Sequence, residues 1–201
     1  MNRRAMKKPF TLAALLLASL ALSGCGGAGP AERPPLEGAA IGGPFTLMDK
    51  DSRPVRWDDF AGKYRIVYFG YAFCPDACPL DMQVLMAGFH QFAKDQPGLA
   101  DKVQPIFISI DPARDTPQVI GEFAAAFSPR LMGLTGTPAQ IDQAAKAFAA
   151  PYARGKDTAG GYLMDHPRIA YLMGPKGEPI AMLPVDKKPA DVAADLAKWV
   201  K

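Results

Sequence analysis

The strongest constraint on the fold of this chain is an alternation of short apolar runs with segments of helical period. Residues 66–69 and 105–110 are short apolar runs, which predicts two buried strands. Residues 79–94 and 116–127 repeat apolar side chains at close to helical spacing, and Thr116 followed by Pro117 is typical of a helix start. This order of strand, helix, strand and helix favours an α/β sheet with helices on both faces.

Several further elements are predicted on either side of this segment. They are a hairpin of residues 45–48 and 55–57, a helical turn at 57–63 closed by Gly62, a strand at 131–135, a helix at 137–150, a hairpin of residues 169–173 and 180–183, and a helix at 189–200. Residues 45–201 are enough for one domain with its own core. We therefore expect one α/β domain with a central mixed sheet, flanking helices and an N-terminal hairpin.

The first 24 residues have the pattern of an export signal. Four basic residues precede an apolar stretch, residues 10–22, which is too short to span a bilayer. The stretch leads into LSGC at residues 22–25, which resembles the lipobox of bacterial lipoproteins and implies cleavage before Cys25 and lipidation of its sulfur. An ordinary secretory signal with a chance cysteine is the alternative. We expect residues 1–24 to be a signal peptide and the protein to be exported and lipid-anchored to a bacterial cell membrane.

The net charge of +3 belongs to this leader. Without residues 1–24 the chain holds 19 basic and 20 acidic residues, so no nucleic-acid partner is expected. Residues 25–44 follow the leader and are rich in Gly, Pro and Ala, which predicts a flexible, lipid-anchored tether with a mean reach of roughly 25 Å. Such a tether would let the domain of residues 45–201 reach partners on the same membrane.

Cys74 and Cys78 directly follow the predicted strand at 66–69, where open α/β sheets place their sites. Their spacing at the start of a helix predicts both sulfurs on one helix face. A helix N-terminus also lowers thiol pKa and favours the thiolate, which is both a nucleophile and a soft metal ligand. The pair is therefore either a redox dithiol or two-thirds of a metal site.

Three motifs together give the chain a family resemblance. The segments CPDACP at 74–79, DPARDTP at 111–117 and DH at 165–166, in this order and spacing, resemble the Sco/SenC family. That resemblance implies a thioredoxin-like fold and a protein that binds copper and assists assembly of the dinuclear copper centre of cytochrome c oxidase. By position, it implies copper ligands at Cys74, Cys78 and His166, with Cys74 and Cys78 also able to form a redox-active disulfide.

The donor set suits the implied metal, since thiolates and imidazole are ligands for copper as Cu(I) or Cu(II) and select against hard cations. Three protein ligands leave a position open for an acceptor, whereas structural zinc sites usually have four. Pro167 departs from many family members, which have a small hydroxyl residue after the histidine. Two carboxylates are candidate neighbours of the site: Asp165 as a partner of the imidazole and Asp111 near the cysteines. Asp115 and Thr116 are expected to cap the following helix, and Met82 and Met164 to be core residues. His90 is expected to be a surface residue out of reach of the cysteines.

The leading hypothesis is a binding and transfer protein that delivers copper to the copper-bearing subunit of cytochrome c oxidase, with other copper chaperones or thiol reductants as further partners. It breaks no bond in a substrate, so we expect no enzyme in the strict sense. The alternative is a thiol–disulfide reductase acting on that subunit, with Cys74 attacking and Cys78 resolving. A purely structural disulfide is the third hypothesis. His166 separates the first two, because metal transfer requires it and disulfide exchange does not.

Overall fold

A computed structural model describes residues 32–158 and 161–201, and the fold lies in the compact unit Pro34–Lys201. The predicted signal peptide and Cys25 lie outside the described residues. The backbone N–H of Leu36 donates to the carbonyl of Ile180 at 3.0 Å, and that of Gly42 to Ala147 at 2.8 Å. Residues 36–44, which were predicted as the last part of the tether, are therefore hydrogen-bonded to the folded unit at Leu36 and Gly42. No helix in the described ranges is long and apolar enough to cross a membrane.

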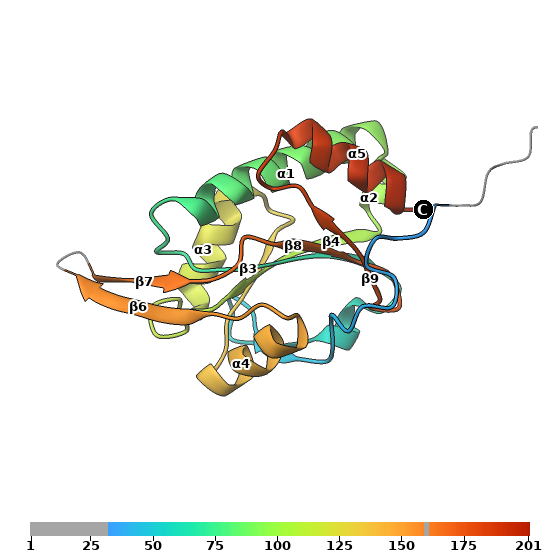
Figure 1. Ribbon diagram of the computed structural model, residues 1–201. Helices are drawn as coiled ribbons and strands as arrows, with labels where there is room; N and C mark the ends of the chain where they lie inside the picture. Colours follow the sequence, from blue (N-terminus) through green and yellow to red (C-terminus); the bar gives the residue numbers. More distant parts are fainter. Residues whose placement is uncertain (1–31, 159–160) are drawn as a thin grey trace, which may run out of the picture. The chain divides into compact units, whose positions relative to one another are not determined.

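The unit alternates strands and helices along the chain (Figure 1). The elements are β1 (Thr46–Met48), β2 (Pro54–Arg56), the 3-10 helix η1 (Trp57–Phe60), β3 (Tyr64–Gly70), α1 (Ala77–Asp95), α2 (Pro97–Ala100), β4 (Val103–Ser109), α3 (Pro117–Phe127), β5 (Met132–Leu134), α4 (Pro138–Ala147), β6 (Ala153–Thr158), β7 (Gly161–Asp165), β8 (Ala170–Met173), β9 (Pro179–Leu183) and α5 (Pro189–Trp199). Every predicted strand and helix is present, with ends that differ by a few residues.

The central sheet has five strands in the order β5-β4-β3-β8-β9. β3 pairs in parallel with β4, and β4 with β5, whereas β8 pairs antiparallel with both β3 and β9. All seven residues of β3 are buried, as expected of a central strand covered on both faces. The predicted α/β fold with a central mixed, thioredoxin-like sheet is confirmed, as is the N-terminal hairpin, which is β1–β2.

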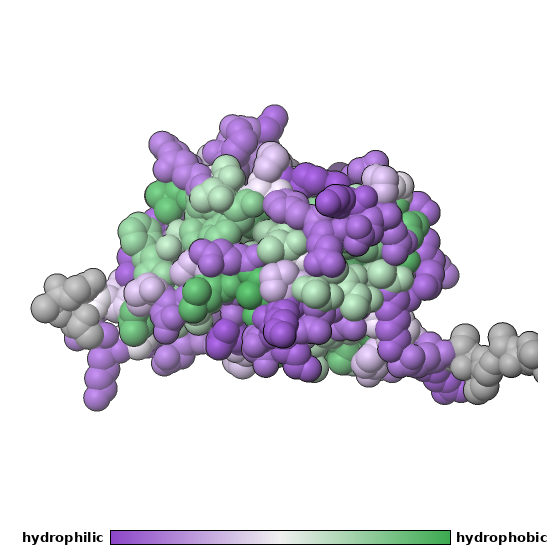
Figure 2. All heavy atoms as spheres, turned by 90° about the horizontal axis from the view of Figure 1, so that it is seen from above, coloured by the Kyte–Doolittle hydropathy of each residue, from purple (hydrophilic) through white to green (hydrophobic). Residues whose placement is uncertain are grey.

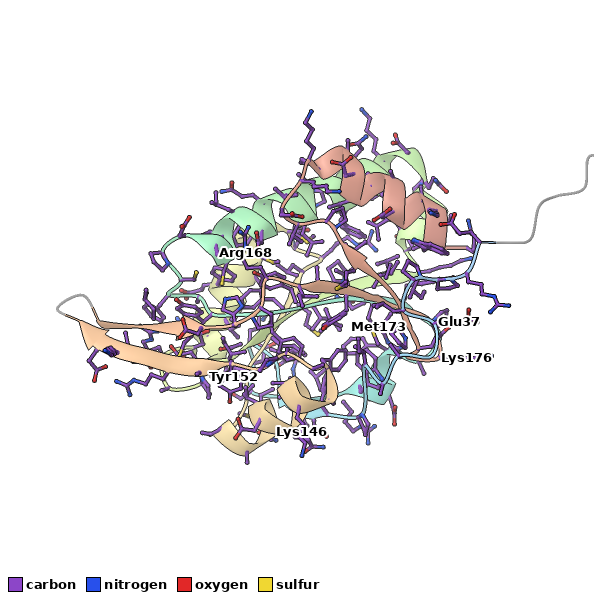
Figure 3. All side chains as sticks on the ribbon, in the orientation of Figure 1. Glu37, Lys146, Tyr152, Arg168, Met173 and Lys176 are labelled. Carbon is purple, nitrogen blue, oxygen red and sulfur yellow. The ribbon has the colours of Figure 1, made fainter. Side chains whose placement is uncertain are left out.

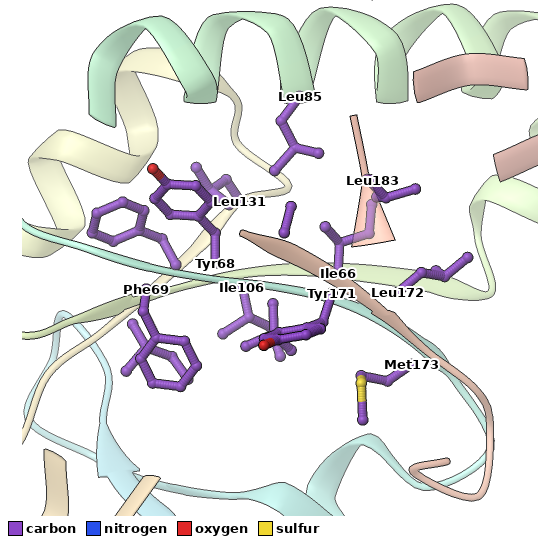
Figure 4. Close-up of a cluster of buried hydrophobic side chains, with 14 of the residues drawn as sticks. Ile66, Tyr68, Phe69, Leu85, Ile106, Leu131, Tyr171, Leu172, Met173 and Leu183 are labelled. Atoms are coloured by element: carbon purple, nitrogen blue, oxygen red, sulfur yellow. The ribbon is translucent and has the colours of Figure 1, made fainter. Parts of the chain in front are cut away.

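Helices cover both faces of this sheet. In Figure 1, α1, α3 and α5 lie on one face, and α4, η1 and the β1–β2 hairpin lie on the other. The alternation of side chains along each strand supplies both cores: Tyr68 and Leu172 point towards α1, whereas Phe69 and Tyr171 point the opposite way (Figure 4). Because the sheet is held from both sides, the carboxyl end of β3 is a rigid platform for the residues that follow it.

The hairpin β6–β7 was not among the predicted elements. It lies between α4 and β8, pairs Ala153 with Asp165 at its base, and extends beyond the sheet in Figure 1. Its register shifts between Arg154 and Asp157, which marks a bulge. β7 ends at Asp165, so the hairpin delivers the chain directly to His166 at the end of the sheet where β3 ends.

Candidate metal centre

The two cysteines occupy different local structures. Cys78 is in the first turn of α1, whereas Cys74 lies in the loop between β3 and that helix. The prediction that both cysteines lie on one helix face is therefore wrong, because α1 begins only at Ala77. The thiols nevertheless meet: the backbone N–H of Cys78 donates to the Cys74 sulfur at 3.3 Å. Both are free thiols, with Cys78 buried and Cys74 half-buried.

His166 is brought to this pair from the far end of the domain sequence. Its Nε2 lies 3.3 Å from the Cys78 sulfur, and its Nδ1 lies 3.1 Å from the carbonyl oxygen of Pro167. A carbonyl can only accept, so Nδ1 carries the proton and the lone pair of Nε2 faces the sulfur. Tyr68 and Tyr71 place their rings edge-on to the imidazole, with centroids 6.2 and 6.0 Å away. The ring is thus held in the orientation of a ligand.

The two thiols differ in acidity. Burial strongly raises the pKa of Cys78, so this thiol keeps its proton in the metal-free protein. Burial also opposes ionisation of Cys74, but hydrogen bonds from the backbone N–H groups of Cys78 and Asp76 outweigh it and lower the pKa of Cys74. The helix N-terminus was expected to favour both thiolates; it does so only for Cys74, because desolvation dominates at Cys78.

Two neighbouring rings support this distribution of protons. Burial raises the pKa of Tyr71 to about 12, so its hydroxyl stays protonated and serves the Cys74 sulfur as a hydrogen-bond donor. Burial lowers the pKa of His166, which keeps the imidazole neutral at neutral pH. A neutral imidazole and a thiol of lowered pKa favour soft-metal binding, and the second thiol must release its proton when the metal binds.

The three predicted donors come close without enclosing a metal ion. Within residues 32–158 and 161–201, no three His, Cys, Asp or Glu side chains are already arranged to hold one. The Cys78 sulfur and His166 Nε2 are adjacent, and the Cys74 sulfur lies on the backbone side of Cys78. Binding of one ion by all three therefore requires their side chains to move from these positions.

Other residues singled out in the sequence form no hydrogen bond with the donor side chains in the described part of the chain. Asp165 is exposed, and the Pro167 carbonyl, not a carboxylate, accepts the imidazole proton. His90 is exposed on α1, with Nε2 3.0 Å from the Ser128 hydroxyl, as expected of a surface residue. Met82 is fully buried in the core, and Met164 is half-buried against it.

The loop after β4 contacts the cysteine loop through buried carboxylates. Asp115 accepts the backbone N–H of Ala72 at 3.0 Å and the Ser109 hydroxyl at 2.6 Å. It is not the helix cap that was predicted; Thr116 fills that role by accepting the N–H of Val119 at 3.3 Å. Burial raises the pKa of Asp115.

Asp111, whose proximity to the cysteines the sequence left open, is buried and contacts the β6–β7 hairpin. It accepts the hydroxyl of Tyr162 on β7 at 2.8 Å and Arg114 Nε at 2.5 Å. The Arg114 guanidinium also lies 3.7 Å from the centroid of the Tyr162 ring. Asp111 thus holds in place the hairpin that leads to His166.

Asp81 and Arg168 were not predicted as part of the site. Asp81 lies three residues after Cys78, and Arg168 two residues after His166, and the two form an ion pair although Asp81 is fully buried. The only sequence signal was a carboxylate among apolar residues of the helix beginning at the cysteines, which by itself does not identify a partner.

Comparison with known proteins identifies the family of this chain. The family model described as SCO1/SenC matches residues 33–201. The mitochondrial SCO1 homolog of Homo sapiens is 37% identical over 162 residues, covering 80% of this chain and 53% of that protein. Protein SenC of Rhodobacter capsulatus is 45% identical over 138 residues, covering 69% and 61%. The chain therefore spans little more than half the length of these curated relatives.

Solved structures with copper bound have the same fold. ScoI of Bradyrhizobium japonicum with copper bound superposes with a TM-score of 0.72 and 36% identity, over 80% of this chain and all (100%) of that one. Yeast Sco1 with copper bound gives 0.72 and 31%, over 80% and 88%. The family model and the relatives confirm the resemblance carried by the motifs at 74–79, 111–117 and 165–166, and the chain belongs to the SCO1/SenC family.

Proposed function

We propose that this chain is a copper metallochaperone that binds one copper ion through Cys74, Cys78 and His166. It delivers the ion to the dinuclear copper centre of cytochrome c oxidase. The observation that carries the proposal is the 3.3 Å approach of His166 Nε2 to the Cys78 sulfur, from a residue 88 positions further along the chain. The family's copper-bound structures support copper as the metal.

The chemistry of the three donors fits copper in both oxidation states. Two thiolates favour the softer Cu(I), and imidazole nitrogen also suits Cu(II). Uptake must displace the proton of Cys78, whose pKa burial raises, so copper binding weakens as pH falls. Three protein donors leave room for a ligand of the acceptor, which allows the ion to be handed on.

Exposed apolar side chains around the donors support docking to a protein acceptor. Phe73 precedes Cys74, Leu80 follows Cys78 by two residues and Leu163 lies on β7, and each is about half exposed. Figure 2, which looks onto the α1 and α5 side, shows hydrophobic side chains gathered on the half of this face nearer the β6–β7 hairpin.

We place the protein outside the cytoplasm, anchored through lipid on Cys25, with a thiol reductant keeping Cys74 and Cys78 reduced.

The test is a copper titration of the reduced chain from Gly26 onward, without oxygen, with Cu(I) and with Cu(II). We expect one tight equivalent and thiolate-to-Cu(II) absorption that is lost in His166→Ala and in Cys78→Ser. His90→Ala is the matched control, because it removes a histidine on α1 that does not contact the cysteines. Copper binding unchanged by His166→Ala, or absent from the wild type, would contradict the proposal.

The unequal thiols favour thiol–disulfide reductase activity as a second candidate. The half-buried Cys74, with its lowered pKa, has the character of an attacking thiolate, and the buried Cys78 that of a resolving thiol. This activity predicts rapid reduction of an oxidised acceptor subunit by the reduced chain. Reduction should survive His166→Ala, whereas copper transfer should not, so one variant separates the two functions.

A further inference from the structure

An ion pair between the buried Asp81 and the half-exposed Arg168 lies next to the candidate metal centre. Asp81, on α1 one turn after Cys78, is 0% exposed. It accepts Arg168 Nε at 3.0 Å, and Arg168 Nη2 contacts its second oxygen. The Tyr68 hydroxyl, from β3, donates to the same carboxylate at 2.7 Å. In Figure 3 Arg168 lies below α1, on the face of the sheet that α1, α3 and α5 cover.

Arg168 belongs to the short loop, residues 166–169, that carries His166. The ladder of β6 and β7 ends at Asp165, and the pairing of β8 with the central sheet begins at Ala170. The loop is therefore outside both ladders, and strand pairing does not fix its position. The contact of the planar Arg168 guanidinium with both oxygens of the Asp81 carboxylate fixes the position and direction of this loop instead.

The same network contacts the imidazole from a second direction. Tyr68, whose hydroxyl binds Asp81, presents its ring edge-on to His166. Burial strongly raises the pKa of Tyr68, which keeps the hydroxyl a donor. The Asp81 carboxylate, on the helix of Cys78, thus contacts both the loop of His166 and the tyrosine whose ring packs against the imidazole.

We propose that Asp81 and Arg168 are positioning residues that hold His166 Nε2 against the Cys78 sulfur. Their ion pair links the first turns of α1 to the His166 loop, and it sets the distance between two donors that are 88 residues apart in the sequence. The proposal rests on the proposed copper function for its consequence in metal binding. Its structural part, the placement of the His166 loop, does not depend on copper.

The experiment compares Arg168→Gln, Asp81→Asn and the double variant in the full chain, purified in detergent. Hydrogen exchange of the metal-free protein reports on residues 166–169, and Cu(II) titration reports affinity and thiolate absorption. Arg168→Lys restores the charge without the two-point contact. Arg130→Gln is the control, because Arg130 also joins elements, donating to the Ala100 carbonyl at 2.7 Å, away from the donors.

We expect both single variants to speed exchange in residues 166–169 and to weaken copper binding by about 10- to 100-fold, with altered thiolate absorption. The double variant should lose no more than the worse single one, because the residues act as one pair. Arg168→Lys should recover part of the loss, and Arg130→Gln should change neither reading.

Two outcomes separate the proposals. If the variants lower only the unfolding temperature and leave loop exchange and the copper spectrum as in the wild type, the ion pair stabilises the fold alone and the positioning role is wrong. If the wild type binds no copper, the proposed function fails, but exchange in the metal-free loop still decides whether Asp81 and Arg168 position His166.

Discussion

At the residue scale, the centre combines one thiol poised to ionise with one that holds its proton. Hydrogen bonds from Cys78 and Asp76 lower the pKa of Cys74, whereas burial raises that of Cys78. A copper ion would meet a ready thiolate first and then displace the proton from the deeper thiol beside His166. If copper binds in this order, the half-buried sulfur of Cys74 would be the point of entry and of exit.

Alkylation tests this difference. In Cys78→Ser, the pH midpoint of iodoacetamide reaction at Cys74 should lie below that of a free cysteine measured alongside, because a lowered pKa retains the thiolate at lower pH. In Cys74→Ser, Cys78 should react slowly at every pH below 9, being buried and protonated. Equal rates and midpoints at the two thiols would contradict the assignment.

Gly70 is required by the close approach of the Cys78 sulfur. A Cβ added there would lie 3.0 Å from that sulfur and 2.9 Å from Phe107 Cζ. Gly70→Ala should therefore destabilise the protein by about 1–3 kcal/mol and weaken copper binding, because the sulfur must move. Gly98→Ala, whose added Cβ meets nothing within 4 Å, is the control and should leave both unchanged or slightly raise stability. Urea unfolding and copper titration measure stability and copper binding in both variants. Unaltered copper binding in Gly70→Ala would show that Gly70 is not needed to make room for the Cys78 sulfur.

Sequence motifs led directly to Cys74, Cys78 and His166, because soft donors at fixed spacings are rare and chemically specific. Their assignment as one ligand set stays a prediction. Asp81 could not be recognised in the same way, since a carboxylate acquires meaning only from the Arg168 side chain that reaches it in the fold. Asp115 was assigned to a local cap, but its partners are the backbone of Ala72 and the Ser109 hydroxyl. Local sequence rules describe turns better than contacts between loops.

At the scale of elements, the hairpin β6–β7 controls where His166 enters the site. β7 ends one residue before His166, and its Tyr162 hydroxyl binds the buried Asp111 at 2.8 Å. Arg114 and Arg154 place their guanidinium groups 3.7 and 3.9 Å from the Tyr162 ring centroid. These contacts fasten a two-stranded element that has no neighbour in the central sheet.

Tyr162→Phe tests this fastening. Loss of the hydroxyl should cost about 1 kcal/mol, speed hydrogen exchange in β7 and weaken copper binding less than His166→Ala does. Tyr152→Phe is the control, because it removes a similar hydroxyl bond, to Asp142 at 2.5 Å on α4. If both variants leave β7 exchange as in the wild type, the hydroxyl does not hold the hairpin.

The predicted elements and the missing one differ in their hydrophobic signal. The strands β3 and β4 are nearly continuous apolar runs, because helices cover both of their faces, and such runs are visible in any sequence. β6 reads Ala-Arg-Gly-Lys-Asp-Thr, and none of residues 153–157 is buried, so no apolar alternation predicted this strand. Arg65 is the opposite case, because it is a charged residue that is nevertheless buried inside β3. Its guanidinium donates to the Gly174 carbonyl at 2.9 Å.

At the scale of the whole molecule, the donors share their chain segments with three exposed apolar residues, Phe73, Leu80 and Leu163. Leu80 and Leu163 flank the residues that we propose to hold copper, on the two chain segments that supply the thiols and the imidazole. A surface of this composition suits brief docking of a protein acceptor, because apolar contacts form without committing charged groups. Delivery would then be limited to partners that cover these residues.

Leu80→Ser should slow copper transfer to the isolated copper domain of the oxidase subunit severalfold while leaving copper affinity unchanged, because the leucine side chain is 51% exposed and is no donor. Met182→Ser is the control, since Met182 is 54% exposed on β9, the edge strand that β8 separates from β3. Stopped-flow transfer from the loaded chain measures both variants. Equal transfer rates for the two would show that this face does not dock the acceptor.

The central claim is that Cys74, Cys78 and His166, donors from two widely separated segments of the sequence, share one metal ion. X-ray absorption of the Cu(I)-loaded chain tests it most directly, because the method counts the sulfur and nitrogen atoms bound to copper. We predict two sulfur atoms and one nitrogen in the wild type, and loss of the nitrogen in His166→Ala with both sulfur atoms retained. Copper bound by sulfur alone in the wild type, or a nitrogen that persists in His166→Ala, would contradict the account.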